Sequence, residues 1–432
     1  MQAEGAAGNN ITLTGNITGA NQCTTQLTIA GNLTLDLAGY ALTIDLPAAT
    51  GQTSNGIKIN NGITLTIMDS SSPSTGELTV TNGADFFNTP APNSNFGAAI
   101  NSSEGTLIIN SGTITATGGY YGAGIGGGAN GEGGTITING GTVTANGGYA
   151  AAGIGSGRNS AGGTITINGG TVTANGGSGG AGIGGGFNAA GGPITISGGT
   201  VTATGGSGAS AGIGGGAYGA SGSIAISGSA SVTATGGNGW DTVGSGAGIG
   251  SGGTNAAAPA AVGAITINTT GTVTATGGAA STTGAATGGA GAAIGQGGYN
   301  GGAGAPVLPT APQGFTATPA IGQVTLAWSA PTAVNGIAIT GYQVSSNNGA
   351  TWVNASSPTG HTFSGLTGGT PYTFQVRALF NNGFGVAGSV TATPLANLAG
   401  TTTSIPVLHP VGLLLLVLAL GGLAVRRRVG KA

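Results

Sequence analysis

Charged side chains are scarce in this chain of 432 residues, which has nine acidic and seven basic residues. Four of the basic residues, Arg426, Arg427, Arg428 and Lys431, lie at the C-terminal end, so the body of the chain has too few for a nucleic-acid interface. The single cysteine, Cys23, excludes a disulfide framework and any metal site built from several cysteines. We predict no nucleic-acid partner, no metal and no cofactor, and a buried free thiol at Cys23.

Residues suited to catalysis are few as well. The two histidines, His361 and His409, lie in the C-terminal third, and the charged residues between positions 90 and 300 are Glu104, Glu132, Arg158 and Asp241. A hydrolase or lyase needs acids, bases or a metal gathered on one face. We therefore predict no catalytic residues and a protein that is not an enzyme.

Glycine is abundant, with 97 residues, and it accompanies an internal repeat. The string GTITINGGTVTANGG begins at Gly134 and returns unchanged at Gly163. Weaker copies extend the series, and the steps between its matching apolar positions are 29, 29, 29 and 30 residues, at Leu107, Ile136, Ile165, Ile194 and Ile224. A fixed period of this length is typical of a stack of repeated units.

Each unit contains three short extended pieces, such as residues 135–138, 142–145 and 152–154, separated by Gly, Asn or Ser turns. Alternation sends Ile136, Ile138, Val143 and Ala145 to one face and threonines to the other. A unit this short cannot bury its own apolar face, so successive units must stack with parallel strands about 4.8 Å apart. The repeats therefore predict a parallel, right-handed β-helix over residues 1–303, in about nine coils.

The repeats resemble the pectate-lyase-like β-helix fold, whose members often act on polysaccharides. That resemblance implies a second candidate function, a polysaccharide-active lyase or hydrolase. Its carboxylates would have to come from the N-terminal coils, where the charged residues near strands are Asp36, Lys58, Asp69 and Glu77. A solvated surface is the interpretation that we prefer for these four residues.

From residue 306 the composition changes to alternating strands at short, regular spacing, the pattern of a β-sandwich. Residues 306–396 resemble a fibronectin type III domain, with Pro312 at its start, Trp328 in the second strand and Leu366 before a turn. Tyr372, at the beginning of the strand that contains FQVRA, stands at the family's tyrosine corner. The resemblance implies an immunoglobulin-like sandwich, which we expect to act as a spacer.

After a linker at residues 397–404, the chain ends in SIPVLHPVGLLLLVLALGGLAVRRRVGKA. Residues 411–425 are uncharged and mostly apolar, which predicts a C-terminal transmembrane-like helix. Ile405, Pro406 and the cluster Arg426, Arg427 and Arg428 resemble the IPTL-CTERM sorting tail of Gram-negative bacteria. The resemblance implies export, engagement of the inner membrane, a processing protease as partner, and a final place at or beyond the cell surface. Because MQAEGAAGNN lacks a signal peptide's apolar core, we expect the export signal upstream of Met1.

Aromatic residues are sparse, so their positions carry more information. Two insertions interrupt the repeats, at residues 81–95 and 236–247, and a third lies at residues 256–262. Because insertions on repeat proteins tend to gather on a binding face, the candidate ligand-binding residues in or near them are Phe86, Phe87, Tyr120, Tyr149 and Trp240. Their rings would stack on sugars. The alternative is packing, with Phe86 and Phe87 covering an open side of the stack.

The rows of threonines suggest a further alternative, an ice-binding surface. Pro193 and Ala225 interrupt one row, and the step from Ile224 to Ile265 lengthens to 41 residues. Both observations argue against an ice-binding surface. The sequence as a whole favours an exported cell-surface protein, structural or adhesive, that binds extracellular polysaccharide through its β-helix without catalysis. A polysaccharide-active enzyme is the alternative, and an ice-binding protein is the minor one.

Overall fold

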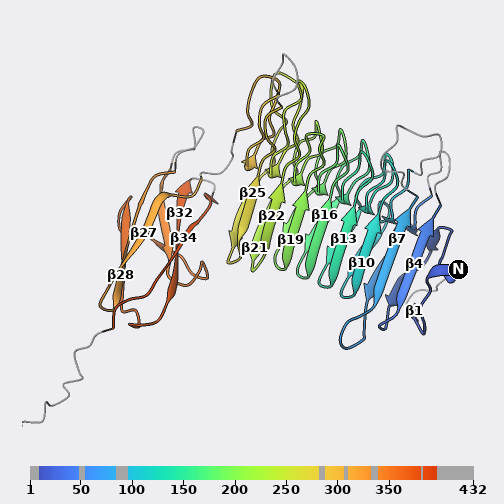
Figure 1. Cartoon of the computed structure of the whole chain (residues 1–432), viewed down its shortest axis with the longest axis horizontal. Helices are drawn as coiled ribbons and strands as arrows, with labels where there is room; N and C mark the ends of the chain where they lie inside the picture. The colour runs from blue at the N-terminus through green and yellow to red at the C-terminus, as the bar shows by residue number, and fades with distance from the viewer. Residues whose placement is uncertain are drawn as a thin grey trace, which may run out of the picture.

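The computed structural model describes residues 9–47, 54–83, 96–281, 288–305, 310–331, 339–380 and 383–396. In these residues the regular structure is all strand, apart from one 3-10 turn, η1 (Gly19–Asn21). Figure 1 shows two parts: a solenoid whose strands β1 to β26 lie in rows, and a smaller sandwich beside its last coil.

The solenoid is made of three parallel sheets, and each full coil adds one strand to each of them. Sheet 1 has nine strands: β1 (Asn9–Thr12), β3 (Leu33–Asp36), β6 (Thr64–Met68), β9 (Thr106–Ile109), β12 (Thr135–Ile138), β15 (Thr164–Ile167), β18 (Ile194–Ile196), β21 (Ile224–Gly228) and β24 (Ile265–Thr269). Sheet 2 has eight: β4 (Ala41–Leu46), β7 (Glu77–Asn82), β10 (Thr113–Thr117), β13 (Thr142–Asn146), β16 (Thr171–Asn175), β19 (Thr200–Thr204), β22 (Ser231–Thr235) and β25 (Val273–Thr276). Sheet 3 has nine: β2 (Leu27–Ile29), β5 (Ile57–Ile59), β8 (Ile100–Asn101), β11 (Ile125–Gly126), β14 (Ile154–Gly155), β17 (Ile183–Gly184), β20 (Ile213–Gly214), β23 (Ile249–Gly250) and β26 (Ile294–Gly295).

The register between coils follows the repeat. Ile136 pairs with Ile165, which pairs with Ile194. Ile138 pairs with Ile167 in a second column, two residues further along the strands. These side chains, and that of Val143 in the coil of Ile136, are at most 1% exposed. The predicted parallel β-helix with apolar columns inside is therefore confirmed. Burial fixes this register, because a slip of one residue would turn every buried isoleucine outward.

The 41-residue step from Ile224 to Ile265 does not break the stack, and the sequence analysis placed two insertions, at residues 236–247 and 256–262, within this step. Ile224 pairs directly with Ile265, and Val232 pairs with Val273, in the register of the other coils. The additional residues leave the coil between strands, where insertions cost little. The strand edges therefore continue without interruption from the first coil to the last.

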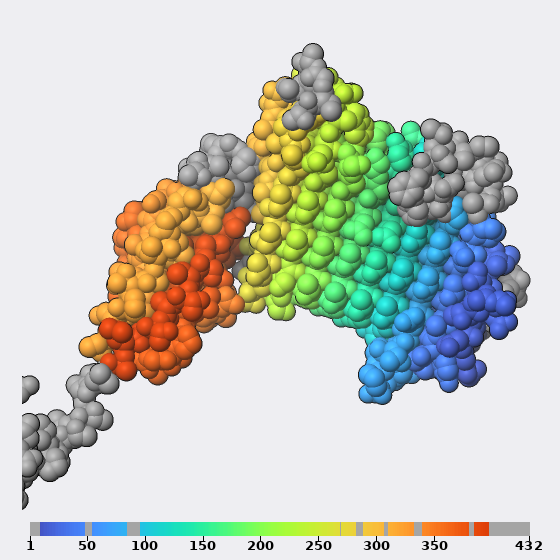
Figure 2. All heavy atoms as spheres, viewed as in Figure 1, coloured from blue at the N-terminus to red at the C-terminus, as the bar shows by residue number. Residues whose placement is uncertain are grey.

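The outer surface of sheet 2 is called here the threonine face. Its central column is threonine in all eight strands: Thr43, Thr79, Thr115, Thr144, Thr173, Thr202, Thr233 and Thr274. Figure 2 views this face, which is a regular grid of side chains without a hollow. The described part of the face carries charge near its N-terminal end, at Asp45 and Glu77.

The first coil is less regular than the rest. It contributes no strand to sheet 2, and instead Ile17 bridges to Leu42 and Cys23 bridges to Ile44. Cys23 is a free thiol of intermediate exposure, whereas we predicted a buried one. The physical reason is its position, because a residue in the first coil is covered by described strands on one side only.

The second part is an antiparallel β-sandwich. One sheet consists of β27 (Gln313–Ala320), β28 (Gln323–Ser329) and β31 (Gly360–Ser364). The other consists of β29 (Gly341–Ser345), β30 (Val353–Asn354), β32 (Tyr372–Phe380), β33 (Gly383–Phe384) and β34 (Gly388–Ala392). Trp328 and Phe374 are buried between the sheets, and the Thr367 backbone N–H donates to the Tyr372 hydroxyl at 3.1 Å, as expected of a tyrosine corner.

The sandwich contacts the end of the solenoid. Val386, between β33 and β34, packs against the solenoid core, whose last coil places Ile267 and Val273 at that end. Asn348 of the sandwich also donates a hydrogen bond to the Thr270 carbonyl at 3.4 Å. A solenoid end exposes apolar columns and strand edges that need covering. The sandwich thus covers part of the last coil and is more than the spacer that we expected.

The C-terminal transmembrane-like helix and the sorting residues Ile405, Pro406, Arg426, Arg427 and Arg428 lie outside the described residues, as does most of the first insertion, with Phe86 and Phe87. Across the described ranges, no helix has the length and apolar character needed to cross a bilayer.

Candidate functional site

Two loops of every coil meet on one side of the solenoid. The sheet 3 strand that separates them has three residues in β2 and β5 and only two from β8 onward, as in β14, so the preceding and following loops emerge side by side. Backbone hydrogen bonds join the loops of neighbouring coils: Arg158 N–H donates to the Tyr121 carbonyl at 3.2 Å, and Phe187 N–H donates to the Ala150 carbonyl at 2.8 Å. Side chains from different coils are thereby held at fixed separations.

Aromatic rings gather on these loops. Tyr120 and Tyr149 occupy the same position in adjacent coils, and their rings stack with centroids 5.1 Å apart and planes inclined by 10°. Tyr121 packs edge-on against Tyr120 at 4.6 Å and stacks on Phe96 at 5.1 Å. One coil further along, Phe187 meets Tyr218 edge-on at 5.4 Å. Such arrangements fix the orientation of the rings.

A groove of about 210 Å³ runs along this cluster, and we call it the aromatic groove. It is lined by Tyr121, Tyr149, Ala150, Arg158, Ser178, Gly179, Phe187 and Trp240. The Arg158 guanidinium lies 4.9 Å from the ring centroid of Tyr121 and 5.7 Å from that of Phe187. Gly179 is required beside Phe187, because an added Cβ would lie 2.5 Å from the Phe187 ring. The groove therefore combines flat apolar surfaces with one cation.

The structure brings together three of the five candidate ligand-binding residues. Tyr149 is 49% exposed and Trp240 is 39% exposed, and both line the aromatic groove. Tyr120 is only 6% exposed, because Tyr149 and Tyr121 cover its ring, so it supports the groove from beneath. Burial raises the pKa of the Tyr120 hydroxyl, with smaller contributions from Tyr121 and Tyr149, while Arg158 opposes the shift.

Sequence reasoning missed Tyr121, Arg158 and Phe187. Arg158 and Phe187 hold one position in successive coils, 29 residues apart, where the coil before them has Ala129. The signal in the sequence was a large side chain, Arg158 or Phe187, at a repeat position where the preceding coil has an alanine. Whether that position faced the same side as Tyr149 depended on the path of the two loops, which the repeat period alone does not give.

Asp69, one of the N-terminal carboxylates that we expected on a solvated surface, is instead buried in a structural role. Asp69 is 6% exposed and accepts hydrogen bonds from the backbone N–H groups of Gly39 at 2.8 Å and Gly76 at 2.7 Å, and from the Ser74 hydroxyl at 2.7 Å. Burial alone would raise the Asp69 pKa, but the hydrogen bonds from Ser74, Gly76 and Ser71 together hold it well below its usual range. A carboxylate so fully occupied is unsuited to act as an acid or a base.

Two other acidic residues of the coils line a second, open groove. Glu104 and Glu132 share it with Thr106, Thr135 and Thr164, and Lys58 lies 3.9 Å from the Glu104 carboxylate. No group of three or more metal-ligating side chains occurs in the parts of the chain that the structure describes. Besides the N-terminal coils, this groove is a second place where the enzyme alternative would find two carboxylates.

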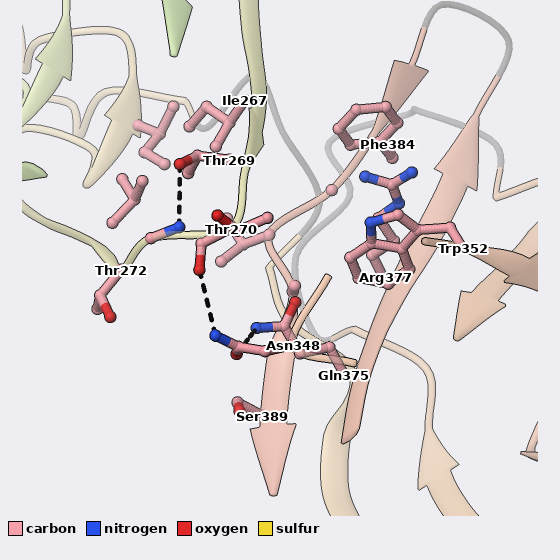
Figure 3. Close-up of a pocket in the computed structure, with 16 residues that line it drawn as sticks. Ile267, Thr269, Thr270, Thr272, Asn348, Trp352, Gln375, Arg377, Phe384 and Ser389 are labelled. Carbon is pink, nitrogen blue, oxygen red and sulfur yellow. Dashed lines mark hydrogen bonds between the residues drawn. The ribbon is translucent and has the colours of Figure 1, made fainter. Parts of the chain in front are cut away.

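A third cavity, of about 190 Å³, lies between the last coil and the sandwich. Figure 3 shows Arg377 sandwiched between Trp352 and Phe384, with the loop Thr269 to Thr272 on the opposite side. Arg377 donates to the Gln343 side-chain oxygen from Nε at 3.1 Å and from Nη2 at 2.7 Å, and burial lowers its pKa to about 10. Its contacts within the sandwich give it a structural role, and we assign no ligand to this cavity.

Comparison with known protein families agrees with the two parts of the fold. The β-helix repeat model matches residues 107–129, 136–158, 165–187 and 194–217, and the fibronectin type III domain model matches residues 310–393. The chain contains β-helix repeats and a fibronectin type III domain. The aromatic groove lies on the repeat region, since Tyr121, Arg158 and Phe187 all fall within matched repeats.

Three solved structures are each similar to about a fifth of this chain, and the chain spans 17% of the length of the first two. The twitchin kinase region from C. elegans is 21% identical, with 21% of this chain and 17% of that chain covered and a TM-score of 0.19. Titin kinase with its flanking domains is 24% identical, with 20% and 17% covered and a TM-score of 0.18. A domain of human fibronectin type III domain containing protein 3 is 20% identical, with 22% and 94% covered and a TM-score of 0.18. Among curated proteins none matches this chain.

Proposed function

We propose that this protein is an exported, non-catalytic cell-surface scaffold that adheres to polysaccharide through the aromatic groove. The β-helix repeats and the fibronectin type III domain suit a surface or structural protein, since both are rigid, extended modules. The observation that carries the binding proposal is the groove itself, where Tyr149 and Trp240 remain exposed on a surface that has few other large exposed hydrophobic residues.

The physical argument concerns sugar recognition by aromatic faces. A sugar ring has an apolar face of C–H groups that packs on an aromatic ring, and its hydroxyls bond to nearby polar groups. The groove offers both, with Tyr149 and Trp240 as platforms and Ser178 and Arg158 as polar neighbours. Because neighbouring coils hold these loops by backbone hydrogen bonds, little conformational entropy would be lost on binding.

A glycan array with the full-length chain tests the proposal. We expect binding to one class of oligosaccharide, at least tenfold weaker in Tyr149→Ala and in Trp240→Ala. The matched control is Tyr40→Ala, which removes another exposed tyrosine of the solenoid, 38% exposed, at the turn between β3 and β4. Equal losses in all three variants, or no binding to any glycan, would refute the proposal.

The enzyme alternative differs in its product. An enzyme with its site on the N-terminal coils, or at Glu104 and Glu132, would release sugar from the polysaccharide that it binds. We expect no new reducing ends or unsaturated products when the protein is incubated with a glycan found on the array. Release that disappears in Glu104→Gln or Glu132→Gln would replace our proposal with the enzyme.

The threonine face gives the ice-binding alternative some support. Its central column has eight threonines in register, and the 41-residue step leaves the column intact. Hydroxyls at regular intervals of about 4.8 Å across the strands form a lattice that could order water. Thermal hysteresis with ice shaping, abolished in Thr173→Asp, would establish this function. We expect neither.

The location is proposed from the sequence of the C-terminal tail. Its resemblance to the IPTL-CTERM signal supports engagement of the inner membrane through residues 411–425, cleavage by a processing protease, and release to the cell surface. Mass spectrometry of the mature C-terminus tests this, since processing would remove the arginine cluster. Recovery of the intact tail in the cytoplasmic fraction would contradict it.

A further inference from the structure

Arg158 is the one cationic side chain that lines the aromatic groove. Both polar groups of its backbone are bonded to the preceding coil: its N–H donates to the Tyr121 carbonyl at 3.2 Å, and its carbonyl accepts from Asn130 N–H at 3.0 Å. The guanidinium rests against the rings of Tyr121 and Phe187. These contacts stabilise the cation and define where it lies.

The described residues give this guanidinium no hydrogen-bond acceptor and no carboxylate. The ion pair among them joins Lys58 and Glu104, whereas the Arg158 guanidinium contacts two aromatic rings. Asp241 follows Trp240 in the sequence but forms no ion pair with Arg158. A ring face attracts a cation and leaves the five N–H donors in the guanidinium plane without acceptors.

A half-buried arginine that lines a groove is suited to an anion with two or more oxygens that accept from neighbouring N–H groups. Carboxylates and sulfates accept two parallel hydrogen bonds from a guanidinium, and such bonds are shorter and stronger than those to neutral hydroxyls. The neighbouring Tyr149 and Trp240 provide ring surfaces for a sugar at the same time. One ligand that satisfies both features is a sugar that carries an acidic group.

We infer that the aromatic groove selects anionic glycans, with the acidic group of one sugar held by Arg158 while an adjacent sugar face packs on Tyr149 or Trp240. This inference rests on the proposed function and narrows it to one chemical class of ligand. It also assigns Arg158 a role in specificity, whereas the exposed rings contribute affinity for sugars of either charge.

The experiment compares one glycan in two charge states. A tetrasaccharide that contains glucuronic acid and its methyl ester are titrated into the full-length chain by calorimetry. We expect the acid to bind at least tenfold more tightly than the ester, and a higher salt concentration to weaken only the acid. In Arg158→Gln the acid and the ester should bind with the same affinity as the ester binds the unmodified chain.

Two further variants separate specificity from folding. Arg158→Lys keeps the charge without the planar fork, so it should retain part of the preference and the circular dichroism spectrum of the unmodified chain. Lys58→Gln removes a cation elsewhere on the solenoid and should leave the preference intact. Equal binding of acid and ester by the unmodified chain would overturn the charge inference and leave glycan binding standing. Binding of neither, on a full glycan array, would overturn both.

Discussion

The column of glycines in sheet 3 permits a sharp test of the stacking. Gly155 has φ of +137° and its neighbour in the column, Gly184, has φ of +131°, in a region that residues with a Cβ rarely adopt. A Cβ added at Gly155 would lie 1.9 Å from the Gly184 carbonyl oxygen. That oxygen accepts the hydrogen bond from Ser156 N–H at 3.0 Å, so moving it away breaks a bond of the ladder.

The cost of Gly155→Ala follows from these three effects. Backbone strain contributes about 1–3 kcal/mol, steric overlap a similar amount, and the weakened hydrogen bond about 1 kcal/mol. We expect a loss of about 3–7 kcal/mol, which is a large part of the stability of a typical domain. Urea denaturation followed by circular dichroism measures the shift of the midpoint, and hydrogen exchange at Ser156 reports the local opening.

Two other glycines serve as matched controls. Gly62 has φ of +71° and no atom near an added Cβ, so Gly62→Ala isolates backbone strain, at about 1 kcal/mol. Gly15 has open space around an added Cβ and its φ lies outside the left-handed region, so Gly15→Ala should change stability by no more than about 1 kcal/mol, in the stabilising direction. If Gly155→Ala unfolds at the same urea concentration as Gly15→Ala, the proposed close contact between coils is wrong.

Three other predictions concern the core, a buried carboxylate and the junction. Ile165→Ala, at a position with no exposed surface, should cost about 2–5 kcal/mol, whereas the outward Thr166→Ala should cost less than about 0.5 kcal/mol by the same denaturation assay. The Asp69 pKa is lower in the folded chain than its ordinary value of 3.8, so its contribution to the free energy of unfolding is complete above that pH and is lost as the pH falls further. Asp69→Asn should therefore lower stability at neutral pH by about 2–3 kcal/mol and flatten the acid limb of a stability profile, and an unchanged acid limb would contradict this origin. Val386→Asp should detach the sandwich from the last coil, increasing the radius of gyration in small-angle scattering and hydrogen exchange in β25, while Val353→Asp, 47% exposed on the same domain, should change neither.

The solenoid could be predicted from the repeat, because the interactions that define it join residues that are close in sequence or one period apart. Alternation of Ile and Thr sets the buried face of each strand, and the 29-residue period sets which residues stack, so the three pieces at residues 135–154 fall on β12, β13 and β14 or within one or two residues of them. The fibronectin type III pattern was similarly readable, because Trp328 and Tyr372 stand in recognisable strands.

The candidate site was only partly readable from the sequence. Tyr149 and Trp240 stood out because aromatic residues are rare, but they are about 90 positions apart and no periodicity joins them. Their meeting with Arg158 depends on how an inserted loop folds back over neighbouring coils. Tyr120 and Tyr149 hold the same position in adjacent coils, so the sequence marks both equally as candidates. It does not reveal that the Tyr149 ring covers the Tyr120 ring.

By itself the sequence determined the strands, their inward faces and the order of the coils, because each depends on residues close together or one period apart. The tertiary structure alone decided that the 41-residue step preserves the threonine column, that Val386 covers the last coil, and that Arg158 lies among aromatic rings. These features are set by contacts between loops distant in the chain, whose paths follow from packing and not from any local pattern.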